Sequence, residues 1–313
     1  MARHELRGPD QLGFDGIHRL KVSTTSGKVD VVGVDDTSAD LDGGGDGAEG
    51  RGRATVDVTR VTGREPVIVE ETDGELTIRH GDFKPGLIGW LTGGRKIESD
   101  ISIQVPPDCL VEVTVVSGPL VVSNLHEKTK VQGVSGEITL AQLHGPTDVK
   151  TVSGSITAES VTDDLSAHTV SGSITVIALG TNSTIKAGTT SGAITVDLED
   201  GTDAPTVDLN CVSGTVIVRA PQDANLEVDM STMSGRTVTT FDGLGNQPLM
   251  GSGFPFDKVP FGKPQKLSGV LGSGAGRIKA RAVSGDVTLL RRTGDPELDE
   301  PDPHEDSMAG EDK

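Results

Sequence analysis

The chain has 313 residues, a formal net charge of −19 and only 2% aromatic residues, with no Tyr and one Trp. The negative charge excludes proteins that bind nucleic acid through clustered Lys and Arg, and it opposes electrostatic docking on an anionic membrane. A core without aromatic side chains has to be thin and filled by Val, Ile, Leu and Ala, which favours stacked sheets with a narrow interior.

The N-terminal part of the chain predicts strands interrupted by one loop. Residues 1–14 form an N-terminal segment without an apolar run, so no signal peptide is visible. No stretch reaches the roughly 20 apolar residues that cross a bilayer, and we expect a cytoplasmic protein without a membrane span. Residues 36–54 are rich in Asp and Gly and predict a flexible loop. Runs typical of strands follow at 54–61, 66–70, 75–79, 97–105 and 110–116.

The strongest feature of the sequence is a recurring Ser-Gly pair. Seven pairs follow one another in steps of 18, 18, 18, 20, 22 and 21 residues, and two more flank them. The seven are Ser117-Gly118, Ser135-Gly136, Ser153-Gly154, Ser171-Gly172, Ser191-Gly192, Ser213-Gly214 and Ser234-Gly235, and the flanking pairs are Ser26-Gly27 and Ser284-Gly285. Gly permits a sharp corner, and the alternation after each corner indicates a half-buried strand. We therefore predict an all-β fold, a single-stranded parallel β-solenoid (β-helix) with coils of about 18–22 residues over residues 15–292.

Alignment on the corner places apolar residues in columns that we expect to stack inside one core. The first holds Val116, Val134, Val152, Val170, Thr190, Val212, Met233 and Val283. The second holds Leu120, Ile138, Ile156, Ile174, Ile194, Val216, Val238 and Val287. The third holds Val131, Val149, Ala167, Ile185, Val207 and Val228, and the fourth Leu125, Leu143, Val161 and Leu179. An outward ladder is expected at Thr139, Thr157, Thr175 and Thr195.

Two aromatic segments stand out against this background. Residues 241–277 form an insertion containing Gly, Pro and Phe that we interpret as a long loop, and residues 83–91 hold the only Trp. Such segments either cap the open ends of a solenoid or contact a partner. The candidate partner contacts are Trp90, Phe254, Phe256 and Phe261.

Few residues point to chemistry. His126 and His144 lie one coil apart and are expected to stack, but Thr162 follows them, so no third zinc ligand is present in that column. Asp197, Glu199, Asp200 and Asp203 surround one connection, either as a solvated turn or as a calcium site. No catalytic motif is present, and we predict no catalytic residues, no metal and no cofactor. Residues 293–313 predict a disordered acidic tail.

The repeats resemble the bacterial adhesin-like β-strand-repeat family, also called toastrack domains. The resemblance rests on the serial V-S-G-x-I/V-T units, on Ile101-Ser-Ile-Gln-Val-Pro-Pro107, and on the ending Ala282-Val-Ser-Gly-Asp-Val-Thr-Leu-Leu290-Arg. It covers roughly residues 15–292. It implies a parallel β-solenoid, a function that is uncertain within the family but associated with adhesion or envelope-stress sensing, and no catalytic motif.

Three functional hypotheses follow. The first is a noncatalytic scaffold that binds a protein partner across an extended face. The second is a calcium-dependent β-helix that binds or acts on polysaccharides. The third is self-association through the open ends of the solenoid, where strand edges are unpaired.

Overall fold

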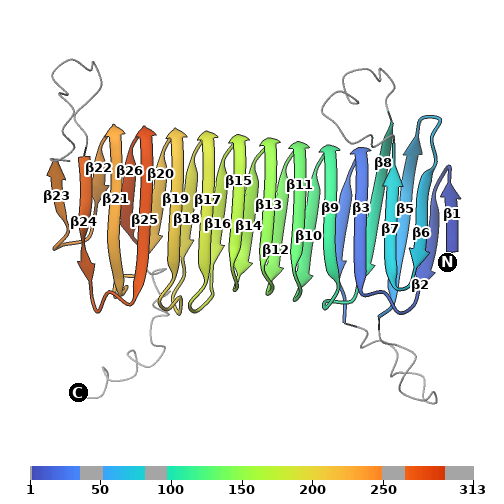
Figure 1. Cartoon of the computed structure of the whole chain (residues 1–313), viewed down its shortest axis with the longest axis horizontal. Helices are drawn as coiled ribbons and strands as arrows, with labels where there is room; N and C mark the ends of the chain where they lie inside the picture. Colours follow the sequence, from blue (N-terminus) through green and yellow to red (C-terminus); the bar gives the residue numbers. More distant parts are fainter. Residues whose placement is uncertain (1, 36–51, 82–96, 249–264, 293–313) are drawn as a thin grey trace, which may run out of the picture.

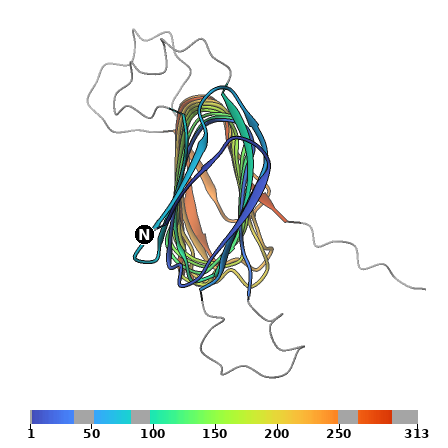
Figure 2. The ribbon, with the colours of Figure 1, turned by 90° about the vertical axis from the view of Figure 1, so that its right-hand side faces the viewer.

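The computed structural model describes residues 2–35, 52–81, 97–248 and 265–292, and every helix or strand within these ranges is a β-strand. The strands form two sheets, one of 14 and one of 12 strands, that extend along the long axis of the molecule (Figure 1). Viewed down that axis, the sheets are two facing layers (Figure 2). The prediction of an all-β fold is confirmed.

The 14-stranded sheet contains, in spatial order, β1 (Ala2–Leu6), β6 (Val67–Thr72), β7 (Glu75–His80), β3 (Arg19–Ser26), β9 (Leu110–Ser117), β11 (Thr129–Ser135), β13 (Thr147–Ser153), β15 (Leu165–Ser171), β17 (Thr184–Ser191), β19 (Thr206–Ser213), β25 (Gly276–Ser284), β21 (Leu226–Ser234), β24 (Gln265–Leu271) and β23 (Gly245–Pro248). The 12-stranded sheet contains β2 (Asp10–Phe14), β5 (Ala54–Thr62), β8 (Glu98–Val105), β4 (Val29–Gly33), β10 (Leu120–Leu125), β12 (Ile138–Leu143), β14 (Ile156–Val161), β16 (Ile174–Ala178), β18 (Ile194–Leu198), β20 (Val216–Ala220), β26 (Val287–Arg291) and β22 (Thr237–Thr239).

Between β9 and β20 the chain winds regularly. Each coil is one strand of the 14-stranded sheet, a Ser-Gly corner and the next strand, which lies in the 12-stranded sheet. Adjacent coils are parallel and in register, so that Ser135 lies beside Ser153 and Ile138 beside Ile156. Because each coil presents the same pattern of inward residues, stacking buries a continuous apolar core.

Both ends depart from the predicted single-stranded parallel solenoid, because the sheets there are mixed. At one end β1 and β7 both pair with β6 in antiparallel fashion, and β5 pairs likewise with β2 and β8. At the other end β24 pairs antiparallel with β21 and β23. The order also changes: β3 lies between β7 and β9, and β25 lies between β19 and β21. The coil of Ser284-Gly285 is therefore inserted before the coil of Ser234-Gly235.

Two segments differ in structure from what their composition predicts. Residues 1–14 supply β1 and β2, which belong to the two sheets. Residues 241–277 contain β23, β24 and the start of β25 instead of one long loop. The strands predicted between residues 54 and 116 are confirmed as β5 to β9. Most of the predicted 36–54 loop and the acidic tail lie outside the described residues.

The second, third and fourth predicted columns lie in the core, each with one correction. The third column combines residues from two different strand positions, because Ala167 pairs with Ala187, whereas Ile185 pairs with Leu165. In the second column Thr237, not Val238, pairs with Val287 and is buried. The fourth column ends at Val161, which pairs with Ala178 and leaves Leu179 exposed.

A left-handed residue explains where the fourth column exists. Asn124, Gln142 and Ser160 have φ near 55°, at 55°, 53° and 55°. Each breaks the strand alternation by one residue and returns the next side chain to the core. The strand β16 of the following coil has no such residue, so its inward position falls one place earlier, at Ala178.

Candidate binding surfaces

The Ser-Gly corners are a structural stack. The hydrogen-bond ladder continues through them, since Gly136 N donates to Ser153 O at 3.3 Å and Gly154 N donates to Ser171 O at 3.1 Å. Gly136 has φ +129°, and a Cβ there would collide with the carbonyl oxygen of Gly118 on the previous coil. Only glycine satisfies both conditions, so these corners hold the coils together.

Buried Thr hydroxyl groups donate hydrogen bonds to the carbonyl oxygens of corner glycines on neighbouring coils, a feature that the sequence analysis missed. The residue two places before the corner Ser is a buried Thr at five of the nine corners, namely Thr24, Thr151, Thr169, Thr189 and Thr232. Thr169 Oγ1 donates to Gly154 O at 3.3 Å, Thr189 Oγ1 to Gly172 O at 3.2 Å and Thr232 Oγ1 to Gly285 O at 2.8 Å. Counting the strand alternation backward from the corner would have found this column.

The first apolar column is on the surface, which corrects the prediction that it is buried. Because the Thr before it points inward, the residue next to the corner Ser has to point outward. Val152 is 51% exposed and Val170 52% exposed. The column consists of Val116, Val134, Val152, Val170, Thr190, Val212, Val283 and Met233 in spatial order. We call it the valine column.

A second outward column on the same sheet carries charges of alternating sign. It lies four residues before the valine column on each strand and contains Lys21, Glu112, Lys130, Asp148, Ser166, Lys186, Asp208, Lys279 and Asp229. Lys130 Nζ lies 2.7 Å from Glu112 Oε1, and this hydrogen bond lowers the pKa of the Glu112 carboxyl. We call it the charge column. The alternating signs favour the observed order of the coils, because displacing one coil by one position along the stack would place like charges side by side.

The predicted histidine stack is present. The rings of His126 and His144 lie edge to face, 5.2 Å apart. His144 Nδ1 is 3.0 Å from Thr162 Oγ1, and His126 Nδ1 is 3.4 Å from Asp108 Oδ1. Among the described residues, no three His, Cys, Asp or Glu side chains are arranged to hold a metal ion.

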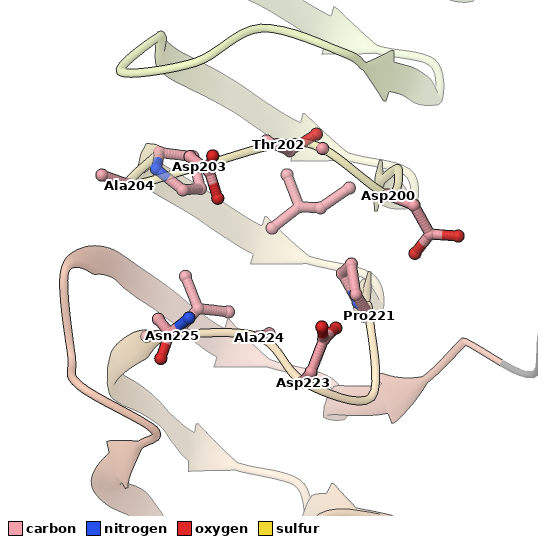
Figure 3. Close-up of a pocket in the computed structure, with 12 residues that line it drawn as sticks. Asp200, Thr202, Asp203, Ala204, Pro221, Asp223, Ala224 and Asn225 are labelled. Carbon is pink, nitrogen blue, oxygen red and sulfur yellow. The ribbon is translucent and has the colours of Figure 1, made fainter.

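The acidic residues around 197–203 do not converge. Asp197 pairs with Arg219 at 3.4 Å and Glu199 with Arg292 at 3.1 Å. Asp200 and Asp203 line a small pocket of about 170 Å³ between two connections, with Asp223 on its other side (Figure 3). Because Arg already neutralises two of the four carboxylates, the arrangement gives no support to a calcium site.

The toastrack DUF4097 family matches residues 47–290, which is more than half of the chain and includes every regular coil. The chain belongs to this family. The resemblance drawn from the Ser-Gly repeats is confirmed. No protein with a curated description matches the toastrack chain in sequence.

Two crystal structures are distantly similar. One is a "putative cell adhesion protein" from Clostridium sporogenes ATCC 15579, with 11% identity, a TM-score of 0.27, and coverage of 91% of this chain and 100% of that one. The other is a "Putative lipid binding protein" from Parabacteroides distasonis ATCC 8503, with 12% identity, a TM-score of 0.31, and coverage of 92% and 98%. Neither likeness is close enough to support a functional inference.

The two cysteines of the toastrack chain are buried, and the aromatic candidates lie outside the described ranges. Cys109 and Cys211 are buried and unpaired with each other, and burial raises the pKa of the Cys109 thiol to about 12. Neither thiol is placed to react. Trp90, Phe254, Phe256 and Phe261 lie outside the described residues. Within the described ranges, no helix has the length and hydropathy to cross a membrane.

Proposed function

We propose that this toastrack chain is a noncatalytic scaffold that binds protein, a solenoid whose coils present one repeated surface. The observation that carries the proposal is the valine column. Single exposed apolar side chains are ordinary on a protein surface, but a contiguous row on a sheet marks an interaction site. Branched, stiff Val side chains also lose little entropy when a partner covers them.

The construction of the sheet supports this use. Val152 and Val170 each lie between a buried Thr and the corner Ser, and the corners are joined to neighbouring coils by backbone hydrogen bonds. A surface held in this way is preorganised, which reduces the free-energy cost of binding. The setting we propose, adhesion or envelope-stress sensing, comes from the family and not from these contacts.

A second set of contacts is proposed from the sequence alone. Trp90, Phe254, Phe256 and Phe261 are most of the aromatic residues of a nearly aromatic-free chain, and aromatic side chains dominate the binding energy of protein interfaces. They would add bulkier anchors to the smaller ones of the valine column.

An affinity capture with matched variants tests the proposal. We expect Val152→Lys with Val170→Lys to lose a partner that the wild type retains from native lysate. The control is Thr157→Lys with Thr175→Lys, which adds the same charge to the outward face of the 12-stranded sheet. A third variant changes Phe254, Phe256 and Phe261 to Ser.

The outcomes separate the two surfaces. Loss of the partner in the valine-column variant alone supports the proposal as stated. Loss in the Phe variant alone assigns binding to the aromatic segment. Equal capture by all four proteins contradicts both, and an acidic-glycan array with and without calcium then tests the polysaccharide alternative.

A further inference from the structure

The charge column has a symmetry that its role within one chain does not require. Taken in spatial order from β3 to β21, its signs are plus, minus, plus, minus, neutral, plus, minus, plus, minus. Ser166 on β15 is the neutral centre, and the phase of the alternation changes there. As a result, reversing the order of the column converts each charge into its opposite.

We propose that a second copy of this chain packs against the outward face of the 14-stranded sheet, related by a two-fold axis that runs along β15. This inference rests on the proposed function and names the partner of the valine column. Such an axis places each column of one copy opposite the same column of the other copy, with the coils in the reverse order. Lys21 then faces Asp229 of the second copy, Glu112 faces Lys279, Lys130 faces Asp208, and Asp148 faces Lys186.

The valine column obeys the same operation. Val170 faces its own copy at the axis, Val134 faces Val212, and Val116 faces Val283. Val152 faces Thr190 and Met233 faces Thr25, so apolar side chains meet apolar or Thr side chains along one side of the face, while opposite charges meet four residues away. A two-fold axis along the length of the molecule would instead place the valine column against charged side chains, which costs desolvation without compensation.

The second half of the charge column holds the cations that a second copy would use. Lys130 is paired with Glu112 within the chain. In the described part of the chain, Lys186 and Lys279 form no ion pair, and Asp148 pairs with Lys150 at 3.0 Å through Oδ2. The proposed packing brings Lys186 to Asp148. Its one like-charge contact is exposed Asp164 against its own copy, at the edge of the face, where solvent screens it.

The face is large enough and flat enough for a stable dimer. Nine parallel strands lie between β3 and β21 inclusive. At about 4.8 Å per strand and about 3.3 Å per residue, they present a face of about 38 by 20 Å, close to the roughly 800 Å² per partner of a standard interface. Viewed down the long axis, the middle coils overlie one another (Figure 2). The sheet thus has little twist, and a reversed copy can follow it along its length.

Thiol crosslinking tests the predicted register. A single Val170→Cys substitution places a thiol at the axis, and a short bifunctional maleimide should link two chains. Val134→Cys and Val212→Cys should each fail alone but crosslink when combined, because each faces the other across the axis. Thr175→Cys on the 12-stranded sheet is the control. Buried Cys109 and Cys211 contribute little background.

Charge reversal tests the pairing. Lys186→Glu should weaken dimerisation measured by sedimentation velocity by about tenfold or more, as truncating a close interfacial charge pair does. Adding Asp148→Lys should restore it. These two positions are two coils apart in one chain, about 10 Å, so rescue reports a contact between chains.

Two results would overturn the inference. One is a wild type that sediments as a single chain up to the highest soluble concentration. The other is crosslinking by the Val170→Cys and Thr175→Cys variants at equal rates. If the valine-column variant still loses a captured protein in either case, the proposed function stands and a different protein covers the face.

Discussion

From β11 to β20, each strand lies beside the strand two places earlier in the chain and runs parallel to it. At the ends, β7 and β25 are placed outside this order, and the outermost strands β1, β2 and β23 run antiparallel to their neighbours, whereas β22 is parallel to β26. The middle has identical neighbours on both sides and can use one repeating sequence. The ends have one open side, and they cover it with hairpins and charged side chains such as Arg3, which pairs with Glu70.

The difference shows what each region needs from its residues. A middle coil has to match its neighbours at the corner, in the core and in charge. An end coil has to stop the stack, so its strands vary in length and direction. Substitutions in the middle should therefore cost more than similar substitutions at the ends, and the predictions below test this from the largest expected effect to the smallest.

The largest effect is expected at a corner glycine. Gly136→Ala places a methyl group against the carbonyl oxygen of Gly118 in a backbone conformation that disfavours any side chain. We expect a loss of about 3–5 kcal/mol in the free energy of unfolding, the range of the most damaging single substitutions. Gly13→Ala in β2 is the matched end variant, because nothing lies within 4 Å of its added Cβ. Urea unfolding followed by circular dichroism measures both, and similar midpoints would contradict the role of the corners.

The next effect is expected in the core. Leu140 in β12 is fully buried, and Leu140→Ala should cost about 2–5 kcal/mol through lost burial and the cavity that remains. Leu6 in the edge strand β1 is also buried, but its strand has a neighbour on one side only. Leu6→Ala should cost about 1 kcal/mol, because the end opens locally before the whole stack unfolds. Hydrogen exchange resolves the two: only Leu140→Ala should accelerate exchange in the middle strands.

A pH effect should be confined to the N-terminal end. His80 in β7 is buried, and burial lowers the pKa of its imidazole. The unfolded state then binds the proton more tightly, so His80 favours folding above the ordinary His pKa of about 6.5 and loses this contribution as the pH falls below it. As the pH falls from about 7.5 to about 5.5, amide hydrogen exchange in β3 and β7 should accelerate relative to exchange in the middle strands, after correction for intrinsic rates. The same acceleration in His80→Leu would rule out this histidine as the cause.

The smallest effect is expected in the charge column. Lys130→Ala removes the partner of Glu112, but both side chains are partly exposed and solvent screens the pair. We expect a loss of about 0.5 kcal/mol or less, and a Glu112 pKa that rises toward its ordinary value. An NMR titration of the carboxyl measures the second quantity, and an unchanged pKa would show that the pair does not form in solution.

The sequence predicted the fold wherever one rule repeats. The Ser-Gly spacing located every corner of the middle coils, and the columns that begin at Leu120 and Leu125 are largely buried as expected. It failed where a hydrophobic residue was assumed to be buried. Val152 and Val170 are apolar but outward, because alternation from the inward Thr residues at 151 and 169 sets their direction.

The ends could not be predicted from the repeat. The placement of β25 between β19 and β21 depends on pairing between strands that are far apart in the chain, and neither spacing nor composition encodes it. The candidate site was missed for a related reason. The symmetry of the charge column exists only in spatial order, which differs from the order of the chain because Lys279 precedes Asp229 in the sheet.

The most direct test of the binding face is hydroxyl-radical footprinting of the wild-type chain, with side-chain oxidation measured by mass spectrometry. Oxidation of Met233 and of the exposed Val residues should slow in native lysate and at high protein concentration. Ile217, which points outward from the 12-stranded sheet, is the internal reference. Selective protection of the valine column is the predicted result. Equal oxidation under all conditions would show that this face has no partner and would contradict the account.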